Sequence, residues 1–290
     1  SFVFAMKNIV FVILLLCCAG MARGEDGIRW HNEASDTTAV VKILNDVAGR
    51  SFESPSARTG YIARMFVGRP YVAHTLEGAE EVLTVNLDEL DCTTFVDVVL
   101  ALSFTAGERR MGWQDFVYNL RRMRYRQGDV RGYGSRLHYN CDWAMDNIHR
   151  GNIEDATRNM PKCNYIVRSI DYMSRHRDSY PALADSAVFA EIVKRERGYR
   201  NHRFPYVKQN DLANGAVEAF LREGDVLAFV SDRKDLDVTH LGFVVKEGGE
   251  LRVLHASSSD GVVEVSDCSL AEFVRRNRHW IGVRVYRLRD

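Results

Sequence analysis

The stretch Asp91-Cys92-Thr93-Thr94-Phe95-Val96 sets a thiol at the start of a predicted helix. Asp91 is a favourable N-cap residue, and apolar residues follow it at helical spacing: Phe95, Val98, Val99 and Leu102. Cys92 is then expected in the first helical turn, where unpaired N–H groups and the positive end of the helix dipole favour a thiolate. Because the thiolate is the nucleophilic form, Cys92 is a candidate catalytic residue.

Two strand-like segments far downstream each carry one histidine, His240 within 238–245 and His255 within 251–257. A cysteine with distant histidines is typical of cysteine hydrolases, whose base is close in space and not in sequence. The alternative for Cys92 is a buried, inert thiol, because it lies three residues before Phe95 on the apolar stripe. A histidine in a strand is likewise more often a packed residue than a catalyst.

The connection between these two segments offers a geometric test. Gly248-Gly249 suits a two-residue hairpin turn, which sets Glu247 opposite Glu250. Counting back along both strands puts Gly242 opposite His255, so that the two histidines share one face and lie one diagonal step apart. A four-residue turn would also keep them on one face, whereas a three-residue turn would separate them.

The N-terminus has the pattern of a secretory signal. After an upstream extension of five residues, Met6-Lys7-Asn8 leads into an apolar run from Ile9 to Cys18, and small residues follow up to Gly24. We expect cleavage after Gly24, because the run is too short to span a membrane. Residues 25–290 are expected to form a single exported domain, periplasmic or secreted, without an integral membrane segment. Bulky residues before Cys17 and Cys18 disfavour lipoprotein anchoring, although these cysteines are its candidate sites.

Composition narrows the remaining choices. The formal net charge is zero, and near −2 once residues 1–24 are removed, so no basic excess indicates a nucleic-acid partner. If Cys92 is a working thiol, at most one disulfide can form among Cys141, Cys163 and Cys268. The sequence contains no His-Glu-x-x-His or Cys-x-x-Cys motif, and we therefore expect no metal and no cofactor.

The order of predicted elements indicates an α+β fold. Helices come first, over 33–48 (capped by Ser35 and stopped by Gly49), 54–68, 92–107, 113–124 and from a cap at Asn140 to 151, with one short strand at 82–85. Residues 160–222 are expected to be short helices and loops. Strands are expected last, over 225–231, 238–246, 250–256, 261–265 and 281–288, with a helix near 269–277. This separation of helices and strands differs from the alternation of a parallel sheet.

Five segments carry a resemblance to a known family: Gly68-Arg69-Pro70-Tyr71-Val72, Leu90 to Val96, Gly224-Asp225-Val226, His240-Leu241-Gly242 and Leu254 to Ser258. They resemble the NlpC-type, papain-like cell-wall cysteine hydrolases, and most closely the N-acetylmuramoyl-L-alanine amidase-like family. The resemblance runs from about Tyr61 to the C-terminus. It implies a papain-like α+β fold in which the helix of the nucleophile packs on an antiparallel sheet that bears the histidines.

The resemblance also implies roles for individual residues. Cys92 would be the nucleophile, His240 the general base and His255 the group that orients the imidazole of His240. Tyr71 would bind the substrate or the oxyanion, together with the backbone N–H of Cys92. The sequence departs from the family pattern at Ala73-His74 and Thr93-Thr94, where NlpC proteins have Gly-Gly and Ser-Gly pairs. This departure leaves the scissile bond open.

The segment from Arg136 to Trp143 resembles a further motif of the family, and makes Arg136 and Tyr139 candidates for substrate binding. Six arginines lie at and before its start, with Asp129 as the only acid among them: Arg121, Arg122, Arg124, Arg126, Arg131 and Arg136. The simpler interpretation is a solvated helix face and loop. The functional one is a cationic wall for the carboxylates of a peptide stem or an anionic polymer.

These observations together favour an exported peptidoglycan hydrolase that acts on muropeptides. The expected reaction is cleavage of the N-acetylmuramoyl-L-alanine amide through a thioester on Cys92. The alternatives are a stem-peptide endopeptidase, a lipid amide or ester hydrolase of the same fold, and a cell-wall binding protein with an inactive site.

Overall fold

The computed structural model describes residues 27–289, and the predicted signal segment lies outside them. The helices are α1 Glu33–Ala48, α2 Pro55–Arg64, α3 Cys92–Gly107, α4 Trp113–Arg124, α5 Asn140–His149, α6 Tyr172–Arg175, α7 Ser186–Arg197, α8 Gly215–Phe220 and α9 Leu270–Arg276. The strands are β1 Arg29–Trp30, β2 Thr84–Val85, β3 Ile153–Asp155, β4 Cys163–Arg168, β5 His202–Lys208, β6 Val226–Ser231, β7 Val238–Glu247, β8 Glu250–Ser257, β9 Val262–Val265 and β10 Trp280–Leu288.

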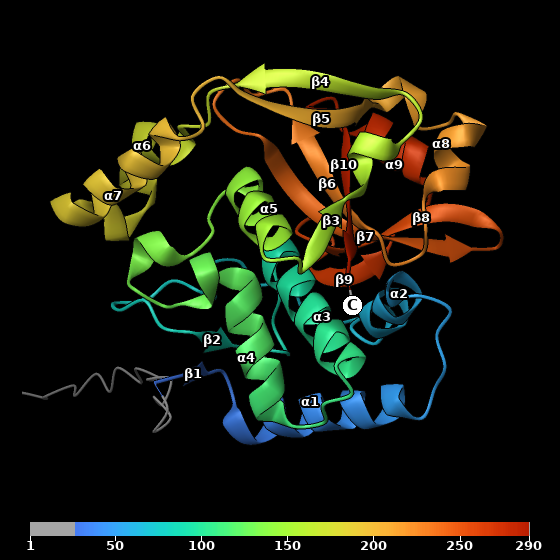
Figure 1. The fold of residues 1–290 in the computed structure, drawn as a ribbon, viewed down its shortest axis with the longest axis horizontal. Coiled ribbons are helices and arrows are strands. Elements are labelled where there is room, and N and C mark those ends of the chain that lie inside the picture. Colours follow the sequence, from blue (N-terminus) through green and yellow to red (C-terminus); the bar gives the residue numbers. More distant parts are fainter. Residues whose placement is uncertain (1–26, 290) are drawn as a thin grey trace, which may run out of the picture.

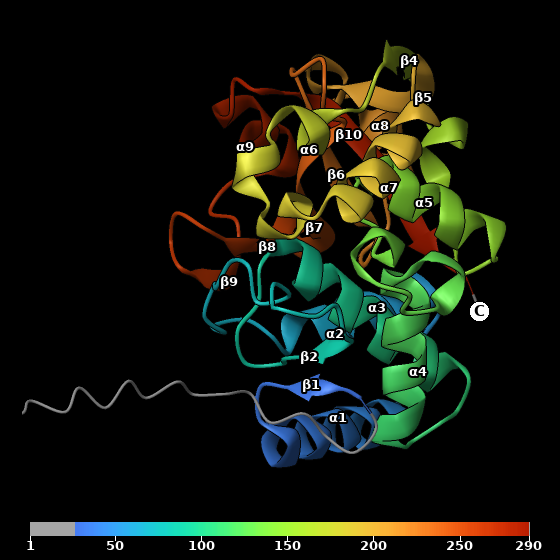
Figure 2. The ribbon, with the colours of Figure 1, turned by 90° about the vertical axis from the view of Figure 1, so that its left-hand side faces the viewer.

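The main sheet is antiparallel and has the strand order β4-β5-β10-β6-β7-β8-β9, with β3 paired to β10. The helices α1 to α5 precede all of these strands in the chain, which confirms the α+β class. Figure 1 shows α3 between the sheet and α4. In the view of Figure 2, α1 and the small parallel pair β1–β2 lie at one end of the molecule, and β4 and β5 lie at the other.

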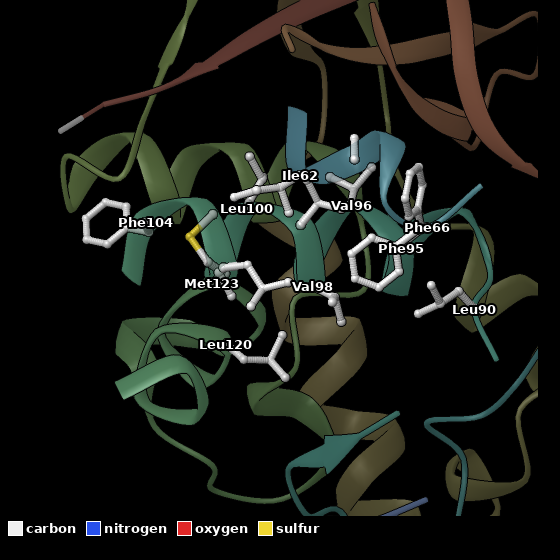
Figure 3. Close-up of a cluster of buried hydrophobic side chains, with 14 of the residues drawn as sticks. Ile62, Phe66, Leu90, Phe95, Val96, Val98, Leu100, Phe104, Leu120 and Met123 are labelled. Atoms are coloured by element: carbon white, nitrogen blue, oxygen red, sulfur yellow. The ribbon is translucent and has the colours of Figure 1, made fainter. Parts of the chain in front are cut away.

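Helix α3 is the centre of the core. Every residue from 94 to 105 is buried, as expected for a helix that is apolar on most sides. Figure 3 shows apolar side chains of α2 and α4 packed around it, among them Ile62, Leu120 and Met123. On the sheet side, Phe95 meets Phe243 of β7 edge to face with ring centroids 5.3 Å apart. This packing fixes the start of α3, and with it Cys92, relative to β7.

The β7–β8 hairpin has the predicted register. Glu247 pairs with Glu250, and Phe243 pairs with Leu254. Gly248 and Gly249 have φ values of 58° and 87°, in the left-handed region that a two-residue turn of this kind requires. Gly242 lies so close to β8 that a Cβ there would stand 2.9 Å from the Leu254 carbonyl oxygen. The close approach of the two strands therefore depends on this glycine.

The prediction for residues 160–222 was wrong, because two paired strands, β4 and β5, lie within that range. Pro205 in the middle of β5 weakens the strand pattern, since proline lacks a backbone donor. The structure accommodates this proline because β10 pairs with β5 only at Val207 and Lys208. On the side that faces β10, the main chain of Pro205 therefore has no strand to pair with.

Several helix ends also differ from the prediction. The cap of α1 is Asn32, whose side chain accepts from the Ser35 N–H, so Ser35 is the partner and not the cap. Helix α2 ends at Arg64, before the predicted stop at residue 68. Asn140 is the first residue of α5 and does not cap it. By contrast, α3 and α4 have the predicted bounds.

The arginine-rich segment is not a uniformly solvated face. Arg124 is buried and pairs with Asp97 of α3, with Nε 3.0 Å from Oδ2. Arg136 is buried and pairs with Glu77 at 2.7 Å and with Glu81 at 3.6 Å. The acids come from distant parts of the sequence, which is why the local composition predicted solvent exposure.

Among residues 27–289, no helix is both long enough and apolar enough to cross a membrane. The four cysteines in this range, Cys92, Cys141, Cys163 and Cys268, are free thiols.

Candidate active site

The first turn of α3 is organised by a capping box. The Asp91 carboxylate accepts from the N–H groups of Thr93 and Thr94 at 3.0 and 2.8 Å, and the Thr94 hydroxyl accepts from the Asp91 N–H at 2.8 Å. The cap thus confirms the predicted helix start at Cys92. Among the hydrogen bonds of the described residues, the Cys92 N–H donates to no other residue, so it is available to an anionic oxygen.

The Cys92 side chain is partly exposed but closely surrounded by protein. Burial raises the pKa of its thiol to about 12, and the adjacent Asp91 carboxylate adds to the rise. The main chain of Leu241 in β7 contacts the sulfur and partly opposes this shift. Burial and the cap carboxylate therefore outweigh the helix N-terminus, and Cys92 is a neutral thiol in the resting protein. The helix start favours a thiolate, as predicted, but its effect on the pKa of Cys92 is smaller than that of burial.

The two predicted histidines meet in space. His240 projects from β7 and His255 from β8, and the Nε2 of His240 lies 3.0 Å from the Nδ1 of His255. Aromatic rings pack against both imidazoles. The ring centroids of Phe229 and Trp280 lie 5.4 and 5.6 Å from that of His240, and the centroid of Phe273 lies 4.8 Å from that of His255. The shared face that the hairpin register predicted is confirmed.

Burial lowers the pKa of His240 to about 3, and the neighbouring His255 adds to this effect. Burial also lowers the pKa of His255 to about 4, partly opposed by a hydrogen bond to the main chain of Ala256 and by the carboxylate of Asp260. Both imidazoles are therefore neutral at neutral pH, and each carries a single ring proton. The neutral pair can share one hydrogen bond, whereas two imidazolium ions at this distance would repel each other.

A carboxylate lies on the side of His255 that faces away from His240. Glu264 of β9, opposite His255 in the strand register, has Oε1 4.0 Å from the Nε2 of His255. This distance is longer than a hydrogen bond, but the negative charge of the carboxylate favours the tautomer of His255 with the proton on Nε2. The Nδ1 of His255 then accepts from Nε2–H of His240, which leaves Nδ1 of His240 without a proton. Glu264 has no signal in the sequence, because only the pairing of β8 with β9 brings it to His255.

Cys92 and His240 line one small cavity of about 110 Å³. Its other walls include His138, Tyr139, Trp143 and Leu241. A second, wider hollow of about 910 Å³ also has His240 in its wall, together with His255, Glu264 and Trp280. His240 therefore stands where the two hollows adjoin.

The three residues predicted to bind the substrate or the oxyanion are Tyr71, Tyr139 and Arg136, and their surroundings differ. Tyr71 lines neither hollow; burial raises the pKa of its phenol, and the neighbouring Cys92 and Asp91 raise it further. Tyr139 is in the wall of the small cavity, but its hydroxyl is held inside the protein by Glu196 at 2.7 Å and by the Met173 N–H at 2.7 Å. Arg136 lines neither hollow, because Glu77 and Glu81 hold its guanidinium elsewhere.

His138 also borders the small cavity, although the sequence analysis named only its neighbours in the same segment as candidates. No pattern of spacing links His138 to Cys92, since the approach depends on how α3, α5 and β7 pack. Within residues 27–289, no group of three His, Cys, Asp or Glu side chains is arranged to hold a metal ion.

Known proteins resemble this chain in sequence and in fold. Residues 61–283 match the family described as N-acetylmuramoyl-L-alanine amidase-like (AmiA-like). The chain is similar in structure to an N-acetylmuramoyl-L-alanine amidase from Bacteroides uniformis, with 34% identity, a TM-score of 0.77, and coverage of 81% of this chain and 99% of that one. A protein of Legionella pneumophila shares the fold, with 21% identity, a TM-score of 0.69, and coverage of 89% and 96%. No curated protein sequence matches the chain. The family match and the structural similarity show that the chain belongs to the N-acetylmuramoyl-L-alanine amidase-like family.

Proposed function

We propose that this protein is an exported peptidoglycan hydrolase of the papain-like, NlpC type, which cleaves the N-acetylmuramoyl-L-alanine amide with Cys92, His240 and His255. The observation that carries the proposal is the arrangement of these three residues. Cys92 and His240 line one small cavity, and His240 is bonded to His255 at 3.0 Å. The family and the similar amidase of Bacteroides uniformis support a peptidoglycan substrate.

The reaction would begin with proton transfer from the Cys92 thiol to Nδ1 of His240. A general base acts within hydrogen-bond reach of the proton or through one water. Among the described residues no hydrogen bond joins the Cys92 sulfur to His240, and the small cavity has room for about three to four water molecules at ~30 Å³ each, so the proton would pass through a bridging water. Because the resting pair is a neutral thiol and a neutral imidazole, the proton moves as the sulfur attacks the carbonyl carbon.

The tetrahedral intermediate needs donors for its oxyanion. The N–H of Cys92, which donates to no other residue, supplies one at the start of α3, where the helix dipole also favours negative charge. The phenol of Tyr71, near the thiol, supplies a second. The protonated His240 then donates its proton to the amide nitrogen as the C–N bond breaks, which releases the amine and leaves a thioester on Cys92.

Deacylation follows the same route with water as the nucleophile. Neutral His240 takes a proton from water, hydroxide attacks the thioester, and the thiolate of Cys92 leaves and recovers the proton. His255 keeps the imidazole of His240 in the required tautomer throughout, because its Nδ1 accepts from Nε2–H of His240. Glu264 supports this tautomer from the other side of His255.

The size of the two hollows suggests how a muropeptide is held. The small cavity accommodates only the atoms around the reacting amide. The hollow of about 910 Å³ beyond His240 has aromatic, hydroxyl and charged groups in its wall, including Trp280, Ser258 and Arg278. Such a mixed lining suits the sugar or the peptide stem of a muropeptide.

The test is incubation of residues 25–290 with defined muropeptides, followed by mass spectrometry of the products. Free glycan with an intact stem peptide, from the wild type but not from Cys92→Ala, is the expected result. Cys163→Ala is the matched control, since Cys163 is also a partly exposed free thiol but lies outside both hollows. Shortened stems still attached to sugar would show that the protein is an endopeptidase and not an amidase. Equal products from Cys92→Ala would refute cysteine catalysis.

A further inference from the structure

His138 is a second imidazole in the small cavity that holds Cys92, and the mechanism above does not use it. It precedes Tyr139 in the segment before α5, and it lies on the wall of the cavity together with Cys92 and His240. Its environment defines what its two ring nitrogens can do.

The tautomer of His138 is fixed by a main-chain contact. The Nε2 atom lies 2.9 Å from the carbonyl oxygen of Tyr133. A carbonyl oxygen only accepts, so Nε2 carries the proton and donates it. The Tyr133 ring packs on the imidazole with centroids 4.4 Å apart, which holds the ring in this orientation.

The imidazole is also kept neutral. Burial lowers the pKa of His138 to about 3, and the guanidinium groups of Arg136 and Arg126 oppose a second proton as well. A neutral imidazole has one N–H, which the Tyr133 carbonyl uses, so Nδ1 is an acceptor. Among the hydrogen bonds of residues 27–289, Nδ1 of His138 has no partner.

The small cavity therefore offers a donor and an acceptor in addition to the imidazole of His240. The Cys92 N–H donates to no residue other than its own thiol, and Nδ1 of His138 has no partner among the described residues. A secondary amide presents the complementary pair, a carbonyl oxygen and an N–H. With room for only about three to four water molecules, the cavity holds the reacting group and little more of the substrate.

We infer that Nδ1 of His138 binds the N–H of the scissile amide and so selects an amide over an ester at the reacting position. This inference rests on the proposed function, of which it specifies the reacting group. An ester has the same carbonyl but an oxygen in place of the N–H, so it leaves the acceptor of His138 unpaired. Sites that hydrogen-bond a substrate N–H reject analogues that lack it, for the same reason.

The test compares two substrates, an N-acetylmuramoyl-L-alanyl peptide and its depsipeptide, in which an ester oxygen replaces the scissile N–H. His138→Phe keeps a ring on Tyr133 but has no acceptor. His138→Asn loses the ring but places Oδ1 on Cγ, where histidine has Nδ1. Both variants lose the bond to the Tyr133 carbonyl, so a purely structural role affects them alike.

The matched control is His176→Phe. His176 also stacks on a tyrosine, Tyr172 at 4.0 Å, and also has a ring nitrogen at 2.7 Å from that residue's carbonyl oxygen, but it lies outside both hollows. We expect His176→Phe to keep the wild-type kcat/KM on both substrates. Thermal unfolding shows whether each variant folds. If His138→Phe does not fold, His138→Leu takes its place, because leucine has the branched shape of asparagine without its acceptor.

We expect His138→Phe to lower kcat/KM about 10-fold on the amide, the loss of one hydrogen bond, and less than about 2-fold on the ester. His138→Asn should keep most of the amide activity. Equal losses on both substrates, or equal losses by the two variants, would overturn the inference and leave the proposed function in place. A wild type that cleaves neither substrate would overturn both.

Discussion

The Nε2 of His240 and the Nδ1 of His255 lie 3.0 Å apart on neighbouring strands, and only one of these two atoms can carry the shared proton. The proton must be on His240 Nε2 if His240 Nδ1 is to accept from Cys92. His255 Nε2 then carries the other proton and faces Glu264 Oε1 at 4.0 Å. Through this chain of contacts the carboxylate of Glu264 influences the tautomer of His240, although it touches neither the thiol nor the substrate.

Replacing Glu264 tests this relay. Glu264→Leu removes the acceptor behind His255, and we expect kcat to fall about 10-fold while KM changes little, because fewer molecules hold the active tautomer. Glu264→Gln still offers an oxygen and should stay within about 3-fold of the wild type. Glu250→Leu, at the turn of the β7–β8 hairpin and outside both hollows, is the control. An equal effect of leucine and glutamine would argue that Glu264 acts through charge alone.

The pH dependence of activity follows from the buried histidines. The general base must be neutral, and burial lowers the pKa of His240 to about 3 and that of His255 to about 4, below the ordinary value of 6.5. As pH falls through 6.5, kcat/KM should therefore persist, and its acidic limb should lie near pH 4. The measurement is kcat/KM on the amide substrate from pH 3.5 to 8. A midpoint near 6.5 would mean that the imidazoles titrate as solvated groups.

Asp91 affects both the stability of α3 and the thiol of Cys92. Its carboxylate caps the helix and raises the pKa of the thiol. Asp91→Asn keeps an acceptor but removes the charge, so the pKa of Cys92 should fall. Alkylation of Cys92 by iodoacetamide, followed by peptide mass spectrometry, should then reach its midpoint at a lower pH.

Asp91→Ala is the companion variant. It removes the same charge and also the cap, and should lower the free energy of unfolding by about 1 kcal/mol. An unchanged alkylation midpoint in both variants would show that the Asp91 charge does not act on the thiol.

The ion pair between Asp97 and Arg124 ties α3 to α4 inside the core. Both side chains are buried, and Arg124 also donates to the Thr84 carbonyl at 2.7 Å. Arg124→Met leaves the Asp97 carboxylate buried without its partner, and should lower the free energy of unfolding by about 3–5 kcal/mol in urea titrations. Asp97→Leu combined with Arg124→Met should recover part of this loss. A double variant as unstable as the sum of the single ones would contradict a direct pairing.

The sequence predicted best those features that depend on near neighbours. The bounds of α3 follow from the cap at Asp91 and the apolar residues behind it, and the register of β7 and β8 follows from Gly248-Gly249. These two elements carry Cys92, His240 and His255, so the principal candidates were available before the structure.

Features that depend on long-range packing were missed. Strand β5 is interrupted by Pro205 and is recognisable only beside β4. The buried state of Arg124 and Arg136 depends on acids far away in the sequence, at Asp97, Glu77 and Glu81. His138 and Glu264 likewise acquire a role only through the elements that pack beside them.

The most direct test of the account is the mass of the protein during turnover. Wild-type protein mixed with an N-acetylmuramoyl-L-alanyl peptide and quenched in acid should gain the mass of the muramoyl acyl group, and proteolysis should place that group on Cys92. Cys92→Ala should gain no mass and form no product. Undiminished hydrolysis by Cys92→Ala, or an adduct on a different residue, would contradict the assignment of Cys92 as the nucleophile.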